Sequence, residues 1–360
     1  MKLFTPYQLG PVELANRIVM APMTRSRATN NVPNELMVKY YALRADAGLL
    51  ITEGTAPSPN GLGYPRIPGI YTDAQIEGWR RVTEAVHARG GKIFLQIMHT
   101  GRISHPDNME AGSTIVAPSA IQASGEIFTD SSGLQPHPLP KEMTPADISQ
   151  AQQEFSQAAK NAIAAGFDGV EIHGANGYLV DQFINPGSNH RSDHYGGSIA
   201  HRCRFAIEVA AAIADAIGAE RTGIRLSPYG VYNDMAIFDD IDDTYEYLAT
   251  ELARLGLAYI HIVDHSAQGA PEVPDEIKGR IKAAFGGTVI ASGGLSKEKA
   301  EQILQSGMAE LTAFGQWFLA NPDLVYRLRN DVDLNTPDYN TFFTPGEKGY
   351  LDYSVTQQAC

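Results

Sequence analysis

Short apolar runs rich in β-branched residues recur along the chain, and a segment with helical periodicity follows each of them. Runs of this length that alternate with helical segments are typical of the buried strands of a parallel sheet. The sequence contains eight such runs: IVMAPM (18–23), LLITEG (49–54), IFLQIM (93–98), GVEIH (169–173), GIRLS (223–227), YIHIV (259–263), TVIASG (288–293) and LTAFG (311–315).

The segments between the runs carry signals for helix starts and ends. In the stretch TPADI, Thr144 is a suitable N-cap, Pro145 suits the first turn, and Asp147 lies three residues after the cap. Apolar residues then keep to one helical face until Gly166, which suits a helix end. A second helix is expected to begin at Ser296.

Eight strand–helix units in one chain favour closure into a (β/α)8 or TIM barrel, a class of α/β fold. A doubly wound open sheet is the alternative, but no glycine-rich dinucleotide fingerprint opens the first helix. Barrels of this kind reach the length of 360 residues as one domain, and no change in composition marks a linker. The sequence therefore predicts a single domain over residues 1–360.

Two segments lie outside the repeating pattern. Residues 100–143, after the third run, carry many Gly, Ser and Pro residues and no helical period. Excursions of this length in a compact domain form a lid or binding loop, with disorder as the alternative. Residues 331–360 lie beyond the eighth unit and are rich in aromatic residues, so they are a candidate to cover an opening of the barrel.

Composition and charge exclude several classes of protein. Hydrophobic residues make up 43% and charged residues 19%, which is ordinary for a globular protein with a large core. The net charge of −13 argues against nucleic-acid and anionic-membrane partners. Two cysteines, Cys203 and Cys360, are too few for a disulfide framework or a four-cysteine metal cluster. With neither a signal peptide nor a membrane span in the sequence, a cytoplasmic protein is expected.

Polar residues at the carboxyl ends of the predicted strands are the candidates for chemistry, because the active sites of TIM barrels lie at that end. Thr24 follows the first run, Gln96 lies within the third and Arg225 within the fifth. An arginine or an amide inside an apolar strand is costly to bury unless it meets an anion or a hydrogen-bonding partner.

The last two runs end in glycine-containing turns. Glycines in these turns expose backbone N–H groups at helix N-termini, which is a common phosphate-binding arrangement in barrels; ordinary tight turns are the alternative. Flavin mononucleotide (FMN) fits a site with a phosphate grip at these turns and a pyrimidine edge against Gln96 and Arg225. The turn residues concerned are Ser292, Gly293, Gly294, Phe314, Gly315 and Gln316.

The motif HGANGY follows the fourth run and places His173, Asn176 and Tyr178 at a strand end. A polar turn that satisfies its own backbone is one interpretation. A metal site is another, because Glu171 and His173 share one side of the strand and His99 is expected nearby. Such a site needs three or four convergent ligands, and Asn and Tyr are poor ones. An acid–base site is favoured by the motif together with Gln96 and Arg225.

The motifs APMTRSRA, LQIMHTGR, HGANGYLVDQFINPGSNHRSDHYGGS, GIRLSP and ANPDL occur in this order along nearly the whole chain. In this respect the chain resembles the Old Yellow Enzyme family of FMN-dependent ene reductases. The resemblance implies that NADPH or NADH reduces a tightly bound FMN and leaves. The reduced flavin then reduces the C=C bond of an alkene activated by a carbonyl or nitro group, at the same site.

The resemblance also implies roles for individual residues. His173 and Asn176 would hydrogen-bond the oxygen of the activating group, and Tyr178 would deliver the proton. Tyr64 and Tyr350 would lie on the substrate side of the pocket. The flavin ring would be held by Pro22, Met23, Thr24, Gly54, Gln96 and Arg225, and the flavin phosphate by the two glycine turns.

Two departures from the family pattern affect affinity and substrate choice more than reaction type. Gln316 stands where many members have an arginine that grips the phosphate, so weaker FMN binding is expected. Met98 stands where many classical members have an aromatic residue, which favours a roomier or softer pocket. Thr24, where one branch has cysteine, places the chain near the classical branch.

Two alternatives to an ene reductase remain open at this stage. A flavin-binding barrel without alkene turnover is one, because a fold does not imply a function. A metal-dependent barrel hydrolase is the other, and it is less favoured. A monomer or a homodimer is equally compatible with the sequence.

Overall fold

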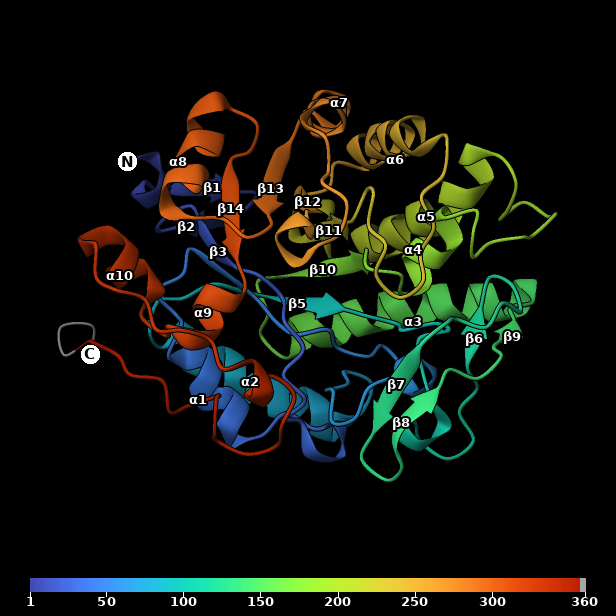
Figure 1. The fold of residues 1–360 in the computed structure, drawn as a ribbon, viewed down its shortest axis with the longest axis horizontal. Helices are drawn as coiled ribbons and strands as arrows, with labels where there is room; N and C mark the ends of the chain where they lie inside the picture. Colours follow the sequence, from blue (N-terminus) through green and yellow to red (C-terminus); the bar gives the residue numbers. More distant parts are fainter. Residues whose placement is uncertain (357–360) are drawn as a thin grey trace.

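The computed structural model describes residues 1–356, and a closed barrel of parallel strands forms its centre (Figure 1). Each strand pairs with its neighbours in chain order, and β14 pairs with β3 to close the barrel. The TIM barrel is thereby confirmed, and the open sheet is wrong. The barrel strands are β3 (Ile18–Met20), β4 (Leu49–Ile51), β5 (Ile93–Ile97), β10 (Gly169–Gly174), β11 (Thr222–Leu226), β12 (Tyr259–Val263), β13 (Thr288–Ser292) and β14 (Leu311–Phe314).

Helices surround the barrel, and short 3₁₀ helices lie in several connections (Figure 1). The α-helices are α1 (Glu35–Ala42), α2 (Asp73–His87), α3 (Pro145–Ala164), α4 (Leu179–Ile184), α5 (Ile199–Ile217), α6 (Ile241–Leu255), α7 (Asp275–Phe285), α8 (Lys297–Ser306), α9 (Gln316–Ala320) and α10 (Leu324–Asn330). The 3₁₀ helices are η1 (Lys2–Phe4), η2 (Thr29–Asn31), η3 (Pro59–Gly61), η4 (Pro106–Asn108), η5 (Ala219–Arg221), η6 (Ser266–Gln268) and η7 (Tyr339–Thr341).

Both predicted helix starts are confirmed by their capping contacts. Thr144 and Asp147 form a capping box, in which each side chain accepts a hydrogen bond from the other residue's backbone N–H. The Ser296 side chain accepts from the Lys299 N–H at the start of α8. Helix α3 ends at Ala164, two residues before the predicted stop at Gly166.

The barrel strands send alternate side chains to two different cores. One set, including Leu49, Phe94, Tyr259 and Ile290, fills the barrel interior. The other set packs against the surrounding helices in a larger core. The antiparallel hairpin of β1 (Tyr7–Leu9) and β2 (Val12–Leu14) adds apolar side chains to the interior core and closes the amino end of the barrel.

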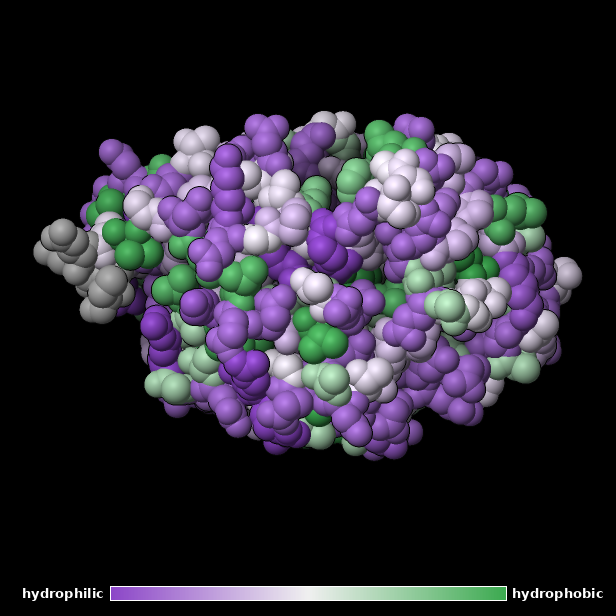
Figure 2. All heavy atoms as spheres, turned by 90° about the horizontal axis from the view of Figure 1, so that it is seen from below, coloured by the Kyte–Doolittle hydropathy of each residue, from purple (hydrophilic) through white to green (hydrophobic). Residues whose placement is uncertain are grey.

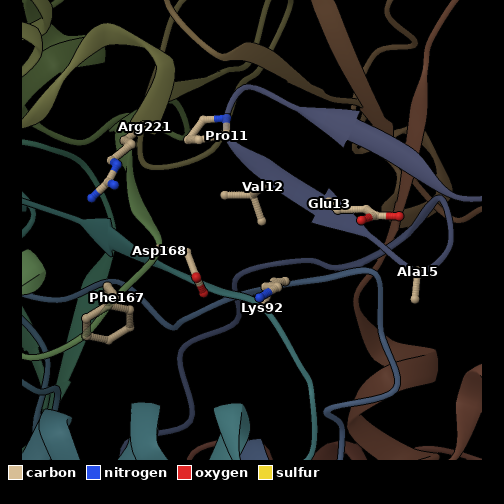
Figure 3. Close-up of a pocket in the computed structure, with 8 residues that line it drawn as sticks. All are labelled: Pro11, Val12, Glu13, Ala15, Lys92, Phe167, Asp168 and Arg221. Atoms are coloured by element: carbon tan, nitrogen blue, oxygen red, sulfur yellow. The ribbon is translucent and has the colours of Figure 1, made fainter.

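A hollow of about 550 Å³ lies beside this hairpin, at the amino end of the barrel (Figure 3). Its lining residues come from β2 and from the segments that lead into β5, β10 and β11. The Asp168 carboxylate there accepts a hydrogen bond from the Ile93 N–H and contacts His87 Nε2, both at 2.9 Å. This end of the barrel carries none of the predicted site residues, and its contacts hold strand ends together.

The excursion at residues 100–143 is built from short strands. Strands β7 (Glu126–Thr129) and β8 (Gly133–Pro136) form an antiparallel hairpin, and β6 (Val116–Ala117) pairs with β9 (Lys141–Glu142) (Figure 1). Apolar side chains of the excursion pack against Tyr64 and Tyr178; they belong to Ile103, Ala123 and Ile127. The excursion therefore covers one side of the carboxyl end of the barrel.

The segment after α10 returns to the loop that follows β3. Arg27 donates hydrogen bonds to the backbone carbonyls of Thr341, Phe342 and Lys348, and Arg25 donates to that of Gly349. Two buried guanidinium groups therefore hold this segment across the carboxyl end of the barrel. Cys360 lies outside the described residues.

The outer surface carries mixed side chains. Figure 2 shows one face, on which hydrophilic residues predominate and hydrophobic residues form small separate groups. Within residues 1–356, no helix combines the length and the apolar character that crossing a membrane requires.

Candidate active site

A cavity of about 600 Å³ opens at the carboxyl ends of the barrel strands. Its size is within the range of small-molecule sites. The loops after β3, β10, β11, β12, β13 and β14 line it, together with part of the segment after α10. Eleven of the sequence-predicted residues lie in its wall: Pro22, Met23, Thr24, Asn176, Arg225, Ser292, Gly293, Gly294, Phe314, Gly315 and Gln316.

Arg225 brings a buried positive charge to this cavity. Burial lowers the pKa of its guanidinium, and the nearby Glu171 opposes that change. Its Nε is buried and has no hydrogen-bond partner among the described residues. A buried guanidinium with an unused donor needs an electron-rich ligand, which is what the pyrimidine edge of a flavin offers.

A chain of buried polar side chains lies beneath the cavity, inside the barrel. The Glu171 carboxylate accepts hydrogen bonds from Gln96 Nε2 at 2.8 Å and from the Tyr259 hydroxyl at 3.1 Å. His261 Nδ1 lies 2.9 Å from the same carboxylate, and His261 Nε2 lies 3.0 Å from Ser292 Oγ. The carboxylate thereby links β10 to β5 and β12, His261 extends the chain of contacts to β13, and Gln96 has the partner that its amide donor needs.

Gly223 makes this chain of contacts possible. A Cβ at this position on β11 would overlap the ring of Tyr259. The absent side chain lets the Tyr259 ring cross β11 and place its hydroxyl on Glu171, which belongs to β10. Packing of the Tyr259 ring therefore requires glycine at the start of the fifth run.

His173 and Tyr178 are neighbours beside the cavity. Their rings lie edge to face with 4.8 Å between centroids, and the Tyr178 hydroxyl donates to the Tyr64 hydroxyl at 3.2 Å. Burial lowers the pKa of His173 well below its ordinary value, and the positive charge of Arg225 adds to this effect. His173 is therefore a neutral imidazole at neutral pH. Burial raises the pKa of Tyr178, so its hydroxyl keeps its proton.

The backbone of Asn176 is held on both sides. Its φ of 59° is left-handed, a region that asparagine tolerates better than most residues. Its N–H donates to Ser227 Oγ at 2.8 Å, and its carbonyl accepts from Asn233 Nδ2 at 2.7 Å. Its side-chain Oδ1 lies 2.8 Å from His265 Nε2.

The turn after β13 requires its two glycines. Gly293 and Gly294 have φ values of 142° and 58°, and a Cβ on either would overlap the loop after β12. Gly315 after β14 has no such requirement, because its φ is −96°. Gln316 accepts a hydrogen bond from the Tyr339 hydroxyl at 2.9 Å, so its amide is engaged at the edge of the cavity.

The remaining predicted residues do not line the cavity. Gly54 lies against the Met98 side chain, and Met98 packs in an apolar cluster that includes Tyr64 and Tyr178. Tyr350 is fully buried: its ring stacks on Tyr40 at 4.1 Å, and its hydroxyl has no partner among the described residues. The structure therefore gathers Tyr64, Met98 and Tyr178 on one side and places Tyr350 apart from them.

His99 and Glu171, considered above as metal ligands, have other contacts. Burial lowers the pKa of His99 to about 4, and its Nδ1 accepts from the Gly101 N–H at 3.1 Å. Glu171 is engaged by its three donors. Within residues 1–356, no group of three or more His, Cys, Asp or Glu side chains is arranged to hold a metal ion.

Sequence reasoning missed part of the cavity wall. His265 follows the sixth run, YIHIV, and the strand-end rule used for the other runs would have found it. Other lining residues gave no signal of this kind, because they come from loops, from η6 and α9, and from the segment after α10. They are Tyr232, Gln268, Trp317, Tyr339, Phe342 and Phe343.

A TIM barrel with a buried guanidinium and glycine turns at one cavity, and a buried amide beneath it, has the features of a flavin-dependent oxidoreductase. Residues 2–335 match the model of the NADH:flavin oxidoreductase / NADH oxidase family. The chain belongs to this family, and the resemblance to Old Yellow Enzymes is confirmed. It is an oxidoreductase that uses FMN, with NAD(P)H as the reductant.

Three relatives are similar to this chain over nearly its full length. A probable flavin mononucleotide-dependent alkene reductase of Leishmania infantum is 42% identical, over 98% of this chain and 96% of the relative. Morphinone reductase in complex with tetrahydroNAD has a TM-score of 0.94 and 43% identity, over 99% of this chain and 98% of the other. The Old Yellow Enzyme homologue of Zymomonas mobilis has a TM-score of 0.94 and 37% identity, over 99% of this chain and all of the other (100%).

Proposed function

We propose that the chain is an ene reductase. Its substrates would be alkenes activated by a carbonyl or nitro group, such as enones, enals, maleimides and nitroalkenes, and its reductant NADPH or NADH. The observation that carries the proposal is the contact of His173 with Tyr178 beside the cavity that holds Asn176 and Arg225. Together these residues would supply neutral donors for an oxygen and a protonated phenol for a carbon.

The cavity wall and the polar side chains beneath it would offer distinct groups to each part of FMN. Arg225 and Gln96 would hold the pyrimidine edge, and Pro22, Met23 and Thr24 would line the ring. The turns at 292–294 and 314–316 would receive the phosphate. When bound there, FMN supplies the hydride chemistry between the nicotinamide and the alkene.

The oxygen of the activating group would be held by His173 and Asn176. A neutral imidazole has one N–H, and the low pKa of His173 keeps it in this form. Negative charge develops on that oxygen as the alkene accepts hydride, so two fixed donors stabilise the transition state more than the ground state.

Tyr178 would donate the proton to the α-carbon. Its raised pKa keeps the hydroxyl protonated at neutral pH, which a proton donor requires. The Tyr64 hydroxyl, 3.2 Å away, keeps the Tyr178 hydroxyl directed to the same side of the pocket. Tyr64 and Met98 would contact the substrate on that side.

Stopped-flow measurement of the two half-reactions tests the proposal. In Tyr178→Phe, we expect reduction of the flavin by NADPH to stay nearly unchanged. Reoxidation by cyclohexenone should slow by about 10²- to 10⁴-fold, the usual contribution of a positioned proton donor. Tyr64→Phe is the comparison variant: it removes the hydroxyl that directs Tyr178 but keeps the acid, so it should slow reoxidation much less than Tyr178→Phe does.

Two results would contradict the assignment. Equal impairment of both half-reactions in Tyr178→Phe would remove Tyr178 from the role of acid. Reduction by NADPH without reoxidation by any activated alkene in the unmodified protein would favour a flavin-binding barrel without alkene turnover.

A further inference from the structure

His265 contacts Asn176 of the candidate oxyanion site. It follows β12, the one strand near the cavity to which the sequence analysis gave no site residue. It lies two residues after the end of β12 and lines the same cavity as Asn176 and Arg225. Its Nε2 is 2.8 Å from Asn176 Oδ1, and its ring packs on that of Tyr232 with 4.4 Å between centroids. The contact joins two loops that are 89 residues apart in sequence.

The charge state of His265 makes this contact a fixed one. Burial lowers its pKa to about 4, and the positive charge of Arg225 acts in the same direction. Asp264 and Gln268 oppose this change. At neutral pH the ring is therefore neutral and carries one N–H. An amide oxygen only accepts hydrogen bonds, so that proton lies on Nε2, facing Asn176 Oδ1.

The other end of the Asn176 amide is thereby defined. With Oδ1 engaged by His265, the Nδ2 group is the end left for a ligand, and among the described residues none accepts a hydrogen bond from it. The backbone of Asn176 is held by Ser227 and Asn233, so a rotation of the whole residue is opposed as well. The amide therefore presents donors.

We propose that His265 is a positioning residue that fixes the Asn176 amide with its N–H donors toward the ligand, so that the site selects ligands with an oxygen acceptor there. The inference rests on the proposed function, because it deepens the role of Asn176 as an oxyanion donor. His265 acts through Asn176 and needs no contact with the ligand itself. Without it, the amide is free to turn its oxygen toward the ligand and repel it.

A double-mutant cycle with phenol as the probe tests this inference. Phenol is titrated into the FMN-loaded enzyme and followed by the long-wavelength absorbance of the complex. His265→Leu should bind phenol about tenfold more weakly, which is the size of one hydrogen bond to a charged group. Asn176→Ala should bind it at least as weakly, and the double variant no more weakly than Asn176→Ala alone.

Two further readouts separate positioning from a general structural effect. The pKa of bound phenol should rise by about one unit in His265→Leu, because the phenolate loses an oriented donor. His265→Gln, which keeps an N–H donor, should recover most of the affinity. Tyr229→Phe is the matched control: it removes a hydroxyl of the same loop that donates to Asp242 and does not line the cavity, so phenol affinity should stay unchanged.

The inference is overturned if His265→Leu binds phenol as tightly as the unmodified enzyme, or if the two losses add in the double variant. Should His265→Leu fail to fold, His265→Phe takes its place in the cycle, because it keeps a ring against Tyr232. Alkene turnover by the unmodified enzyme is measured separately. Its absence would refute the proposed function, whereas the phenol cycle decides the role of His265.

Discussion

Glu171 is the residue whose replacement tests the barrel interior most directly. It is fully buried, and its carboxylate is shared by Gln96 Nε2, the Tyr259 hydroxyl and His261. We expect two substitutions at this position to differ strongly. Glu171→Leu keeps the volume and removes the acceptor, and Glu171→Gln keeps the shape and one acceptor oxygen.

The magnitude follows from the number of donors that each variant leaves without a partner. A buried donor that loses its acceptor costs about 1–3 kcal/mol, so the three donors of Glu171→Leu cost about 3–9 kcal/mol together. Globular domains are stable by only about 5–15 kcal/mol. In Glu171→Gln, the oxygen can face Gln96 while the NH₂ group faces Tyr259 and His261. His261 then accepts at Nδ1 and donates from Nε2 to Ser292, so the cost should stay below about 2 kcal/mol.

Urea unfolding followed by tryptophan fluorescence measures the difference, because Trp79 is fully buried. We expect Glu171→Gln to be soluble and close to the unmodified protein in free energy of unfolding. Glu171→Leu should be recovered in low yield or unfold at a much lower urea concentration. Free energies of unfolding that agree within about 1 kcal/mol for the two variants would refute the reasoning, since the donors would then have found other partners.

Three further predictions concern pH, the segment after α10 and the cofactor. Burial raises the pKa of Asp181 to about 7, so the stability from its protonated form is lost as pH rises from about 4 through 7. Asp181→Asn should therefore gain stability relative to the unmodified protein between pH 5 and 8 in urea unfolding, and a constant difference would contradict this. Arg27→Lys should raise the rate of limited proteolysis after residue 330, because an ammonium lacks the fork that donates to several carbonyls; unchanged cleavage would argue against this clamp. Gln316→Arg should tighten FMN binding about tenfold by fluorescence titration of the apoprotein, and by less at high salt; equal affinity would separate Gln316 from the phosphate.

The barrel could be predicted because buried parallel strands leave a local signal. Each of the eight runs is mostly apolar, since one of its faces meets the barrel interior and the other meets the helices. The strands of the excursion left no such signal: β6 and β9 have two residues each, and their paired residues are 25 positions apart in the chain. Their pattern is too short to differ from a loop.

Those residues of the candidate site that lie at a strand end could be predicted from the sequence. Arg225, Asn176 and the turn at 292–294 were found in this way, and His265 obeys the same rule although it was missed. Contacts between distant loops were beyond the sequence. The Gln316–Tyr339 hydrogen bond and the stacking of Tyr350 on Tyr40 depend on where the segment after α10 settles, and no local pattern encodes that.

The two amides of the site obey one physical rule, although they lie on different strands. Each amide has a donor end and an acceptor end, and a neighbouring side chain engages one of them. Glu171 accepts from Gln96 Nε2, so the Gln96 oxygen is the end left for a ligand, and it would act as the acceptor for the ring N–H of a flavin pyrimidine. His265 engages Asn176 Oδ1, so the Asn176 donors are left, and an oxygen that gains negative charge needs donors. Glu171 and His265 thus determine which end of each amide a ligand meets. This orienting role explains why a carboxylate and a neutral imidazole lie next to the two amides.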